Sequence, residues 1–371
     1  MGYQALEKLL TDLTDSGTIP AITMAVGQKG KLVYSGAFGK IYENDERIVP
    51  TSRFDIASMT KIFSGVCFMK LAEQGKIGLH DPICSMFPEL DTVKPIEEKG
   101  VTVGQCDASK VTWLHVLTHT SGMGFTRPMP FPTLPHLDKG LDDIFTLPFA
   151  YPPGTRVAYN DMPLILLGVA MERVSGRRLD ELVDELICRP MGLLNTGYLR
   201  RSAHPSRIPG VVPTEEDTRF RKQRVWGAVH DENAFLLDGV SGHAGIFSTA
   251  EDICGFALRM ADCLKEDGLL KRATAEEMIR EYAEEDGDRR GIAWQLSIPG
   301  EASYTKYLSH NAYGHSGFTG CFFWNDPEKD LSVVLLSNDV YSGRENRKLF
   351  DVRGEIMRLA VEGSRFPGSG D

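Results

Sequence analysis

The hydrophobic residues near the two ends of the chain are spaced as in short strands, and a helix is predicted beside each group. Residues 3–16 have the spacing of an amphipathic helix, and a closing helix is expected over about 346–361. Four runs rich in β-forming residues flank turn-forming segments: 21–28, 31–38, 320–324 and 331–337. Strands at both ends predict an antiparallel sheet made from both termini, with helices on its faces.

In the middle of the chain, unlike the ends, helical patterns alternate with loops. Two stretches are expected to be loops: the proline-rich stretch 125–136, and the stretch 199–226, whose basic residues we interpret as a solvated surface rather than an anion site. The predicted fold class is α+β, with a sheet domain from 1–80 and 241–371, a mostly helical insertion over 81–240 and an active site at their junction. Helices are predicted over 60–74, 163–174, 178–188 and 249–264.

Charge and cysteine content narrow the class of protein. The 371 residues carry a formal charge of -10, which argues against non-specific nucleic-acid binding because that binding relies on a basic surface. No stretch of the sequence is long and apolar enough to span a bilayer, and seven cysteines at scattered spacings do not suggest a disulfide framework. The first residues lack the layout of a signal peptide, so we expect a cytoplasmic protein; a secreted protein cut from its leader is the alternative.

The first segment with candidate chemistry is Ser58-Met59-Thr60-Lys61, which directly precedes a predicted apolar helix. Positions i and i+3 share one face of a helix, so Ser58 and Lys61 can face the same pocket. A serine hydroxyl is a weak nucleophile until a base takes its proton, and a lysine can be that base when its own pKa falls. We therefore expect a lowered pKa at Lys61. The spacing alone is weak, since an N-cap serine near an exposed lysine has the same pattern.

Two further segments offer groups that suit the same chemistry. Tyr159 precedes an apolar helix, and beside a protonated lysine it would lose its proton more easily and act as a general base. His315, Ser316 and Gly317 are expected to open a strand that continues to Gly320, and an edge strand beside a nucleophile offers a backbone N–H to a developing oxyanion. Each segment by itself also has an ordinary structural interpretation, a packing tyrosine and the start of a strand.

The three motifs occur together in the order and rough spacing of serine β-lactamases and penicillin-binding proteins, and the chain resembles that superfamily. Within it, the chain is most similar to the class C β-lactamase-related esterases and peptidases. The resemblance covers roughly residues 18–361 and implies a β-lactamase/transpeptidase-like fold. Similar linking stretches lie at 54–57, 79–82, 117–122, 153–156, 229–231, 242–250 and 333–338.

The resemblance implies a role for each motif residue. Ser58 is the expected acylated nucleophile, Lys61 is its proton partner, and Tyr159 shares the base role and helps to activate water. The backbone N–H groups of Ser58 and Phe318 are the expected oxyanion hole. The implied activity is that of a serine hydrolase that works without a metal ion or cofactor.

Two positions depart from the pattern of the family. The tyrosine motif of the family usually ends in Asn, and this chain has Asp161 at that position. The strand motif of β-lactamases begins with a lysine that helps to hold the substrate carboxylate, and this chain has His315 there. A neutral histidine holds a carboxylate weakly, and an ionised aspartate cannot donate a hydrogen bond. With Asp161, His315, Ser316 and Gly317 as the substrate-binding residues, we expect a small-molecule ester, amide or peptide as the substrate. We rank carboxylesterase first, D-amino-acid peptidase or carboxypeptidase second and weak β-lactamase third.

Two hypotheses of other classes stay open. A catalytically silent relative would bind cell-wall fragments or serve as a scaffold, and the intact motif residues argue against it. A metal-dependent hydrolase would use His230, Asp231 and His243, but no matching third ligand follows at a suitable spacing, so we expect structural roles for them and no bound metal.

Overall fold

Strands from both ends of the chain pair in one antiparallel sheet, as expected. In the computed structural model, which describes residues 2–124, 137–204, 207–298, 300 and 303–365, the strand order is β11-β12-β13-β14-β15-β16-β1-β2-β3. Met24 of β1 lies opposite Leu335 of β16 on one side and opposite Gly36 of β2 on the other. The strands are β1 Ala21–Gln28, β2 Lys31–Ile41, β3 Glu46–Arg47, β11 Ala283–Glu285, β12 Asp288–Arg290, β13 Gln295–Leu296, β14 Tyr313–Gly317, β15 Cys321–Asp326 and β16 Leu331–Ser337.

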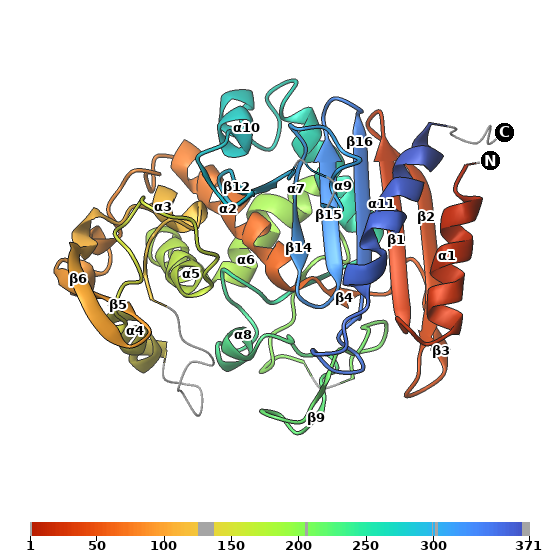
Figure 1. The fold of residues 1–371 in the computed structure, drawn as a ribbon, viewed down its shortest axis with the longest axis horizontal. Coiled ribbons are helices and arrows are strands. Elements are labelled where there is room, and N and C mark those ends of the chain that lie inside the picture. The colour runs from red at the N-terminus through yellow and green to blue at the C-terminus, as the bar shows by residue number, and fades with distance from the viewer. Residues whose placement is uncertain (1, 125–136, 205–206, 299, 301–302, 366–371) are drawn as a thin grey trace.

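Helices cover both faces of this sheet (Figure 1). Helices α1 (Gln4–Asp15) and α11 (Leu349–Ser364) pack on the face that carries Ile22 and Met24 of β1. Helix α9 (Ala250–Asp262) packs on the other face, because Ala21 and Ala25 of the same strand belong to the core that includes Phe256. With both faces covered, β15 and β16 are buried along their whole length, and their sequences are mostly apolar on both faces rather than alternating.

The rest of the chain forms a helix-rich region beside the sheet (Figure 1). Its central helix is α2 (Thr60–Glu73), which is buried over most of its length and is accordingly apolar all round. No helix within the described ranges is long and apolar enough to cross a membrane. The other helices are α3 Trp113–Leu117, α4 Leu137–Thr146, α5 Met162–Ser175, α6 Leu179–Val183, which continues into a π-helical turn Asp184–Cys188, α7 Arg189–Met191, α8 Glu232–Leu236 and α10 Arg272–Ile279. The small sheets are β4 Phe54–Asp55 with β10 Ile246–Ser248 and β7 Gly197–Tyr198, then β5 Val93–Glu98 with β6 Val101–Asp107, and β8 Glu216–Asp217 with β9 Gln223–Arg224.

The α+β fold is confirmed, and three local expectations are corrected. Strand β14 begins at Tyr313 and ends at Gly317, so His315 lies in the middle of the strand and does not open it. The hairpin β5–β6 stands in the stretch expected to be mostly helical. Arg221 is not solvated, because it pairs with Asp217 at 3.0 Å and both side chains are buried. The proline-rich stretch 125–136 lies outside the described residues, and the division into two domains stays a prediction.

Asp55 fixes the turn that leads into α2. Its buried carboxylate accepts hydrogen bonds from the backbone N–H of Ala57 at 2.8 Å and from that of His230 at 2.6 Å. Ala57 has a φ of 48°, a left-handed conformation that is uncommon for a residue with a Cβ. The carboxylate therefore holds a strained turn in place and ties it to a segment that lies far away in the sequence.

We expect Asp55→Ala to lower the free energy of unfolding by about 2–4 kcal/mol, since it leaves two buried N–H groups without an acceptor. Asp55→Asn keeps one acceptor oxygen of the same shape and is expected to cost less. Urea unfolding of both variants measures the difference. An Ala variant as stable as the wild type, or an Asn variant as unstable as the Ala variant, would contradict this role.

Candidate active site

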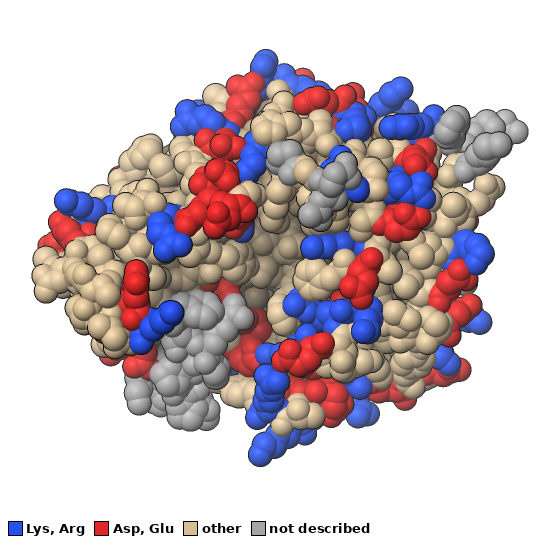
Figure 2. Space-filling model, viewed as in Figure 1, with Lys and Arg blue, Asp and Glu red and all other residues tan. Residues whose placement is uncertain are grey.

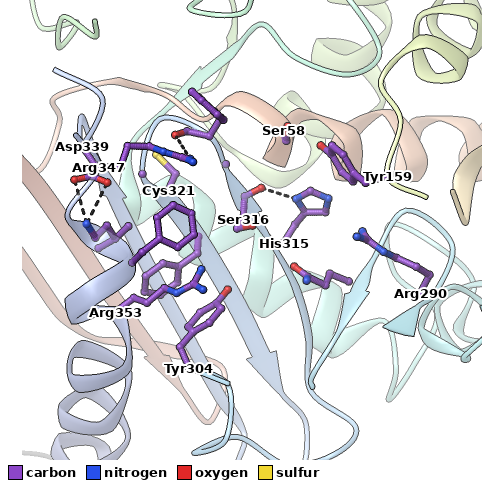
Figure 3. Close-up of a pocket in the computed structure, with 17 residues that line it drawn as sticks. Ser58, Tyr159, Arg290, Tyr304, His315, Ser316, Cys321, Asp339, Arg347 and Arg353 are labelled. Carbon is purple, nitrogen blue, oxygen red and sulfur yellow. Dashed lines mark hydrogen bonds between the residues drawn. The ribbon is translucent and has the colours of Figure 1, made fainter. Parts of the chain in front are cut away.

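A cavity of about 250 Å³ lies between the start of α2 and the edge of β14 (Figure 3). Ser58 and Tyr159 form part of one wall, and Ser316 and Gly317 of β14 form part of another. Every substrate-binding residue expected from the sequence lines this cavity, apart from Asp161, which lines the neighbouring cavity of about 90 Å³. The remaining lining residues of the larger cavity are Arg290, Gln295, Tyr304, His315, Phe318, Gly320, Cys321, Phe322, Asp339, Arg347, Leu349, Phe350 and Arg353.

Ser58 and Lys61 are adjacent, as their spacing predicts. Ser58 lies in a 3-10 turn, Ala57–Met59, immediately before α2, and Lys61 lies in the first turn of that helix. The Lys61 Nζ donates to Ser58 Oγ at 3.0 Å and to the carbonyl oxygen of His243 at 3.0 Å. It also forms an ion pair of 2.8 Å with Asp161 Oδ1, and the Lys61 side chain is 1% exposed. Three segments that are distant in sequence thus meet at one amine.

The charge state of Lys61 differs from the sequence-based expectation. Burial disfavours the charged amine, but the charge and hydrogen bond of Asp161, together with those of Tyr159, outweigh burial, so the pKa of Lys61 lies above its ordinary value. The pKa of Asp161 is held below its usual value, because the charge of Lys61 outweighs the effect of burial. The expected fall in the Lys61 pKa was wrong, because the sequence does not show that Asp161 lies beside it.

Tyr159 is enclosed by other rings near Lys61. The centroid of its ring lies 4.8 Å from the Lys61 Nζ and 4.6 Å from the ring of His119. Burial raises the pKa of Tyr159, although the charge of Lys61 acts in the opposite direction. The charge of Lys61 thus eases loss of the Tyr159 proton, as expected, but burial outweighs it and the pKa of Tyr159 stays above its ordinary value.

Strand β14 comes unusually close to the serine turn. A Cβ added at Gly317 would lie 2.4 Å from the carbonyl oxygen of Ile56, so a glycine is required there. His315 Nδ1 donates to the carbonyl oxygen of Ser316 at 2.6 Å (Figure 3). Burial, with the charges of Lys61 and Arg290, lowers the pKa of His315 to about 3, so this histidine is neutral at pH 7, as expected. The strand offers backbone groups to the cavity without adding charge.

The histidines considered as metal ligands form two separate hydrogen-bonded pairs with carboxylates. His243 Nε2 lies 2.7 Å from Asp231 Oδ1, and His230 Nε2 lies 2.8 Å from Glu215 Oε2. Within the described part of the chain, no three His, Cys, Asp or Glu side chains are grouped so that they could hold a metal ion. These side chains have structural partners, and the absence of a metal from the reaction stays a prediction.

Some residues of the site carry no signal that the sequence analysis used. His119 packs on Tyr159, and its Nδ1 accepts from the backbone N–H of Asn160 at 3.3 Å. Burial keeps the pKa of His119 well below its ordinary value, so the ring is neutral. Its only sequence signal is its place in the stretch 117–122, which resembles the family. Among the residues that line the larger cavity, the sequence analysis also missed Arg290, Arg347 and Arg353.

Comparison with known proteins places this site in a family. A sequence model of the Beta-lactamase family matches residues 6–357. The chain is 29% identical to a putative D-alanyl-D-alanine carboxypeptidase of Escherichia coli, over 91% of this chain and 82% of that protein. It is 27% identical to an N-acetylmuramyl-L-alanine amidase of Bacillus subtilis, over 94% of this chain and 82% of that protein. The fold is similar to that of EstCE1, a hydrolase with promiscuous acyltransferase activity, with a TM-score of 0.73 and 21% identity over 96% of this chain and 99% of that one. The chain therefore belongs to the Beta-lactamase family, among the serine hydrolases of the β-lactamase and penicillin-binding-protein superfamily.

Proposed function

We propose that the chain hydrolyses carboxylic esters or small amides through a covalent acyl-enzyme on Ser58. The observation that carries the proposal is the 3.0 Å hydrogen bond from Lys61 Nζ to Ser58 Oγ, at the wall of a cavity that Tyr159 and Gly317 also line. A buried amine in contact with a serine hydroxyl at a cavity is the arrangement that nucleophilic catalysis requires.

In the proposed reaction, Ser58 Oγ attacks the carbonyl carbon of the substrate. Its proton passes to Lys61, and Tyr159 shares in the transfer. The backbone N–H groups of Ser58 and Phe318 donate to the carbonyl oxygen as negative charge develops on it. The intermediate then collapses, the proton moves to the departing alcohol or amine, and water releases the acid from Ser58 by the same steps. None of these steps uses a metal ion or a cofactor.

Two properties of the site support esters and simple amides over β-lactams. Asp161 is ionised and paired with Lys61, so it cannot donate to a carbonyl oxygen as an asparagine would. His315 is neutral, so it adds no positive charge for a carboxylate.

A peptidase is the second candidate. The carboxylates of Asp161, Asp231 and Glu232 line the smaller cavity beside Ser58, together with Arg344, which pairs with Glu232. A carboxylate at this place suits a substrate with a free amine. Two of the relatives with similar sequences are named as a carboxypeptidase and an amidase, which keeps this candidate open.

Ser58→Ala is expected to lower kcat for p-nitrophenyl butyrate by about a thousandfold or more, because no other group would form the covalent intermediate. Ser64→Ala is the matched control, since Ser64 is a buried serine of helix α2, which follows Ser58, and does not line the cavity. It is expected to stay within about threefold of the wild type. If Ser58→Ala were nearly as active as the wild type, with circular dichroism showing both folded, the serine mechanism would be wrong.

The ion pair between Lys61 and Asp161 predicts the pH dependence of the rate. Lys61 must lose a proton before it can accept that of Ser58, so kcat/KM is expected to fall about tenfold per pH unit below the raised pKa of Lys61. In the Asp161→Asn enzyme, burial acts on Lys61 without the opposing carboxylate. The pKa of Lys61 is therefore expected to fall, and the acid limb of the pH–rate profile to move to lower pH.

Steady-state kinetics from pH 6 to pH 11 measure the midpoint of this limb. Asp238→Asn is the control, because it removes a carboxylate that pairs with Arg200 away from Lys61. An acid limb at the same pH in the Asp161→Asn enzyme and the wild type would contradict the role given to the ion pair.

Substrate preference is expected to follow the charges of Asp161 and His315. A lost charge-assisted hydrogen bond costs about 1.5–3 kcal/mol, or roughly ten- to hundredfold in rate when it acts in the transition state. We therefore expect kcat/KM for nitrocefin to be far below that for p-nitrophenyl butyrate, with Asp161→Asn combined with His315→Lys raising the nitrocefin value. Comparison of these substrates with D-Ala-p-nitroanilide separates esterase from peptidase. A wild type that prefers nitrocefin to the ester would refute this substrate argument.

A further inference from the structure

The Lys61 amine lies among groups that fix the direction of its N–H bonds. An ammonium offers three N–H donors and no acceptor. The partners of Nζ are Asp161 Oδ1 at 2.8 Å, the carbonyl oxygen of His243 at 3.0 Å and Ser58 Oγ at 3.0 Å. When the amine loses a proton it gains a lone pair, to which an ionised carboxylate and a carbonyl cannot donate. The lone pair is therefore left facing the hydroxyl groups of Ser58 and Tyr159, which interact with each other.

The carbonyl group of His243 belongs to a residue whose imidazole ring is bound at both nitrogen atoms. Nε2 lies 2.7 Å from Asp231 Oδ1, and Nδ1 lies 2.8 Å from Ser241 Oγ. The ring is 1% exposed, so water does not compete for either contact. Although burial acts to raise it, the pKa of Asp231 lies below its ordinary value because His243 opposes burial. Nε2 therefore donates to an ionised carboxylate, which is the stronger kind of hydrogen bond.

Both sides of this ring are attached to fixed parts of the fold. Asp231 is the N-cap residue of α8, and its Oδ1 also accepts the backbone N–H of Ala234 at 2.8 Å. The chain just before His243 lies against α5, because a Cβ added at Gly242 would be 2.1 Å from the carbonyl oxygen of Leu164. Figure 2 shows the hollow on this face of the molecule, with acidic side chains at its lower edge, where Figure 1 places α8.

The other buried pair of a histidine and a carboxylate has a different connection. His230 Nε2 lies 2.8 Å from Glu215 Oε2, but the carbonyl oxygen of His230 accepts from the guanidinium of Arg221 at 2.9 Å. That pair therefore stabilises the loop that carries Arg221. The His243 pair leads instead to the amine beside Ser58.

We propose that His243, held by Asp231, is a positioning residue of the hydrolase, whose anchored carbonyl turns the lone pair of Lys61 toward Ser58. The proposal rests on the serine hydrolase function proposed above and adds a residue that acts through Lys61. Without the ring, the carbonyl is free to shift, and the lone pair faces the serine less often. Removal of the Ser58 proton then slows, because proton transfer requires this alignment.

The test measures how fast Ser58 reacts with a fluorophosphonate and how much of it reacts. In this reaction Ser58 Oγ bonds to phosphorus, fluoride leaves, and the hydroxyl proton passes to Lys61. The rate constant reports the orientation of the amine, whereas the final extent of labelling, read by mass spectrometry, reports the fraction of competent enzyme. We expect His243→Ala to lower the second-order rate constant about ten- to hundredfold while labelling still goes to completion.

Two further variants separate positioning from packing. His243→Leu fills the space of the ring without either hydrogen bond, and the same loss of rate is expected from it, so it decides the matter if His243→Ala does not fold. In His243→Gln the side-chain amide replaces Nε2 as the donor to Asp231. Its rate constant is expected to lie between those of the wild type and the Leu variant.

Steady-state kinetics with p-nitrophenyl butyrate give a second measure. The Leu variant is expected to lose kcat by about the same factor as it loses labelling rate, with KM within about threefold of the wild type. His115→Ala is the matched control, because His115 also has a hydrogen-bonded ring nitrogen, accepting from the backbone N–H of Thr112 at 3.1 Å, but lines neither cavity. It is expected to keep the wild-type rates.

Three results would overturn the proposal. One is a Leu variant labelled as fast as the wild type, another is a Gln variant as slow as the Leu variant, and the third is a loss of labelling extent that accounts for the whole loss of activity. Any of these, with the wild type labelled at Ser58, leaves the serine mechanism standing. If Ser58→Ala keeps its activity, the proposed function itself fails.

Discussion

The buried ion pair between Lys61 and Asp161 is the interaction on which the site depends. Removing both charges from water is costly, so the pair persists only where the geometry is close and further hydrogen bonds complete it. Here the ammonium also donates to Ser58 and to the carbonyl of His243, while Asp161 stands at the N-cap position of α5. The pair therefore joins the start of α2, the start of α5 and the segment before β10 around one hydroxyl group.

The sheet supplies the other wall of the site. Gly317 allows β14 to approach the serine turn, and Asp55 ties that turn to the segment around His230. Two cavities open from this point: the smaller is lined by Asp161, Asp231 and Glu232 together with Arg344, and the larger lies along β14.

Features that depend on a local pattern were predicted from the sequence, whereas features that depend on contacts between distant segments were not. Alternation and apolar runs located β1, β2, β16 and most helices, and the i, i+3 spacing placed Lys61 beside Ser58. The pKa of Lys61 was predicted in the wrong direction, because its partner Asp161 lies 100 positions away and meets it through tertiary packing. Arg290, Arg347 and Arg353 have no motif around them, and their place in the cavity wall is known only from the fold.

The most direct test of the central claim is a titration of the Lys61 amine itself, by NMR of protein labelled with ¹⁵N-lysine, with Lys61→Arg used to assign the signal. The account predicts a midpoint above 10.5, the ordinary value for lysine, in the wild type, and a lower midpoint in Asp161→Asn. A wild-type midpoint below the ordinary value, unchanged by Asp161→Asn, would contradict the account, because the carboxylate would then not control the charge beside Ser58.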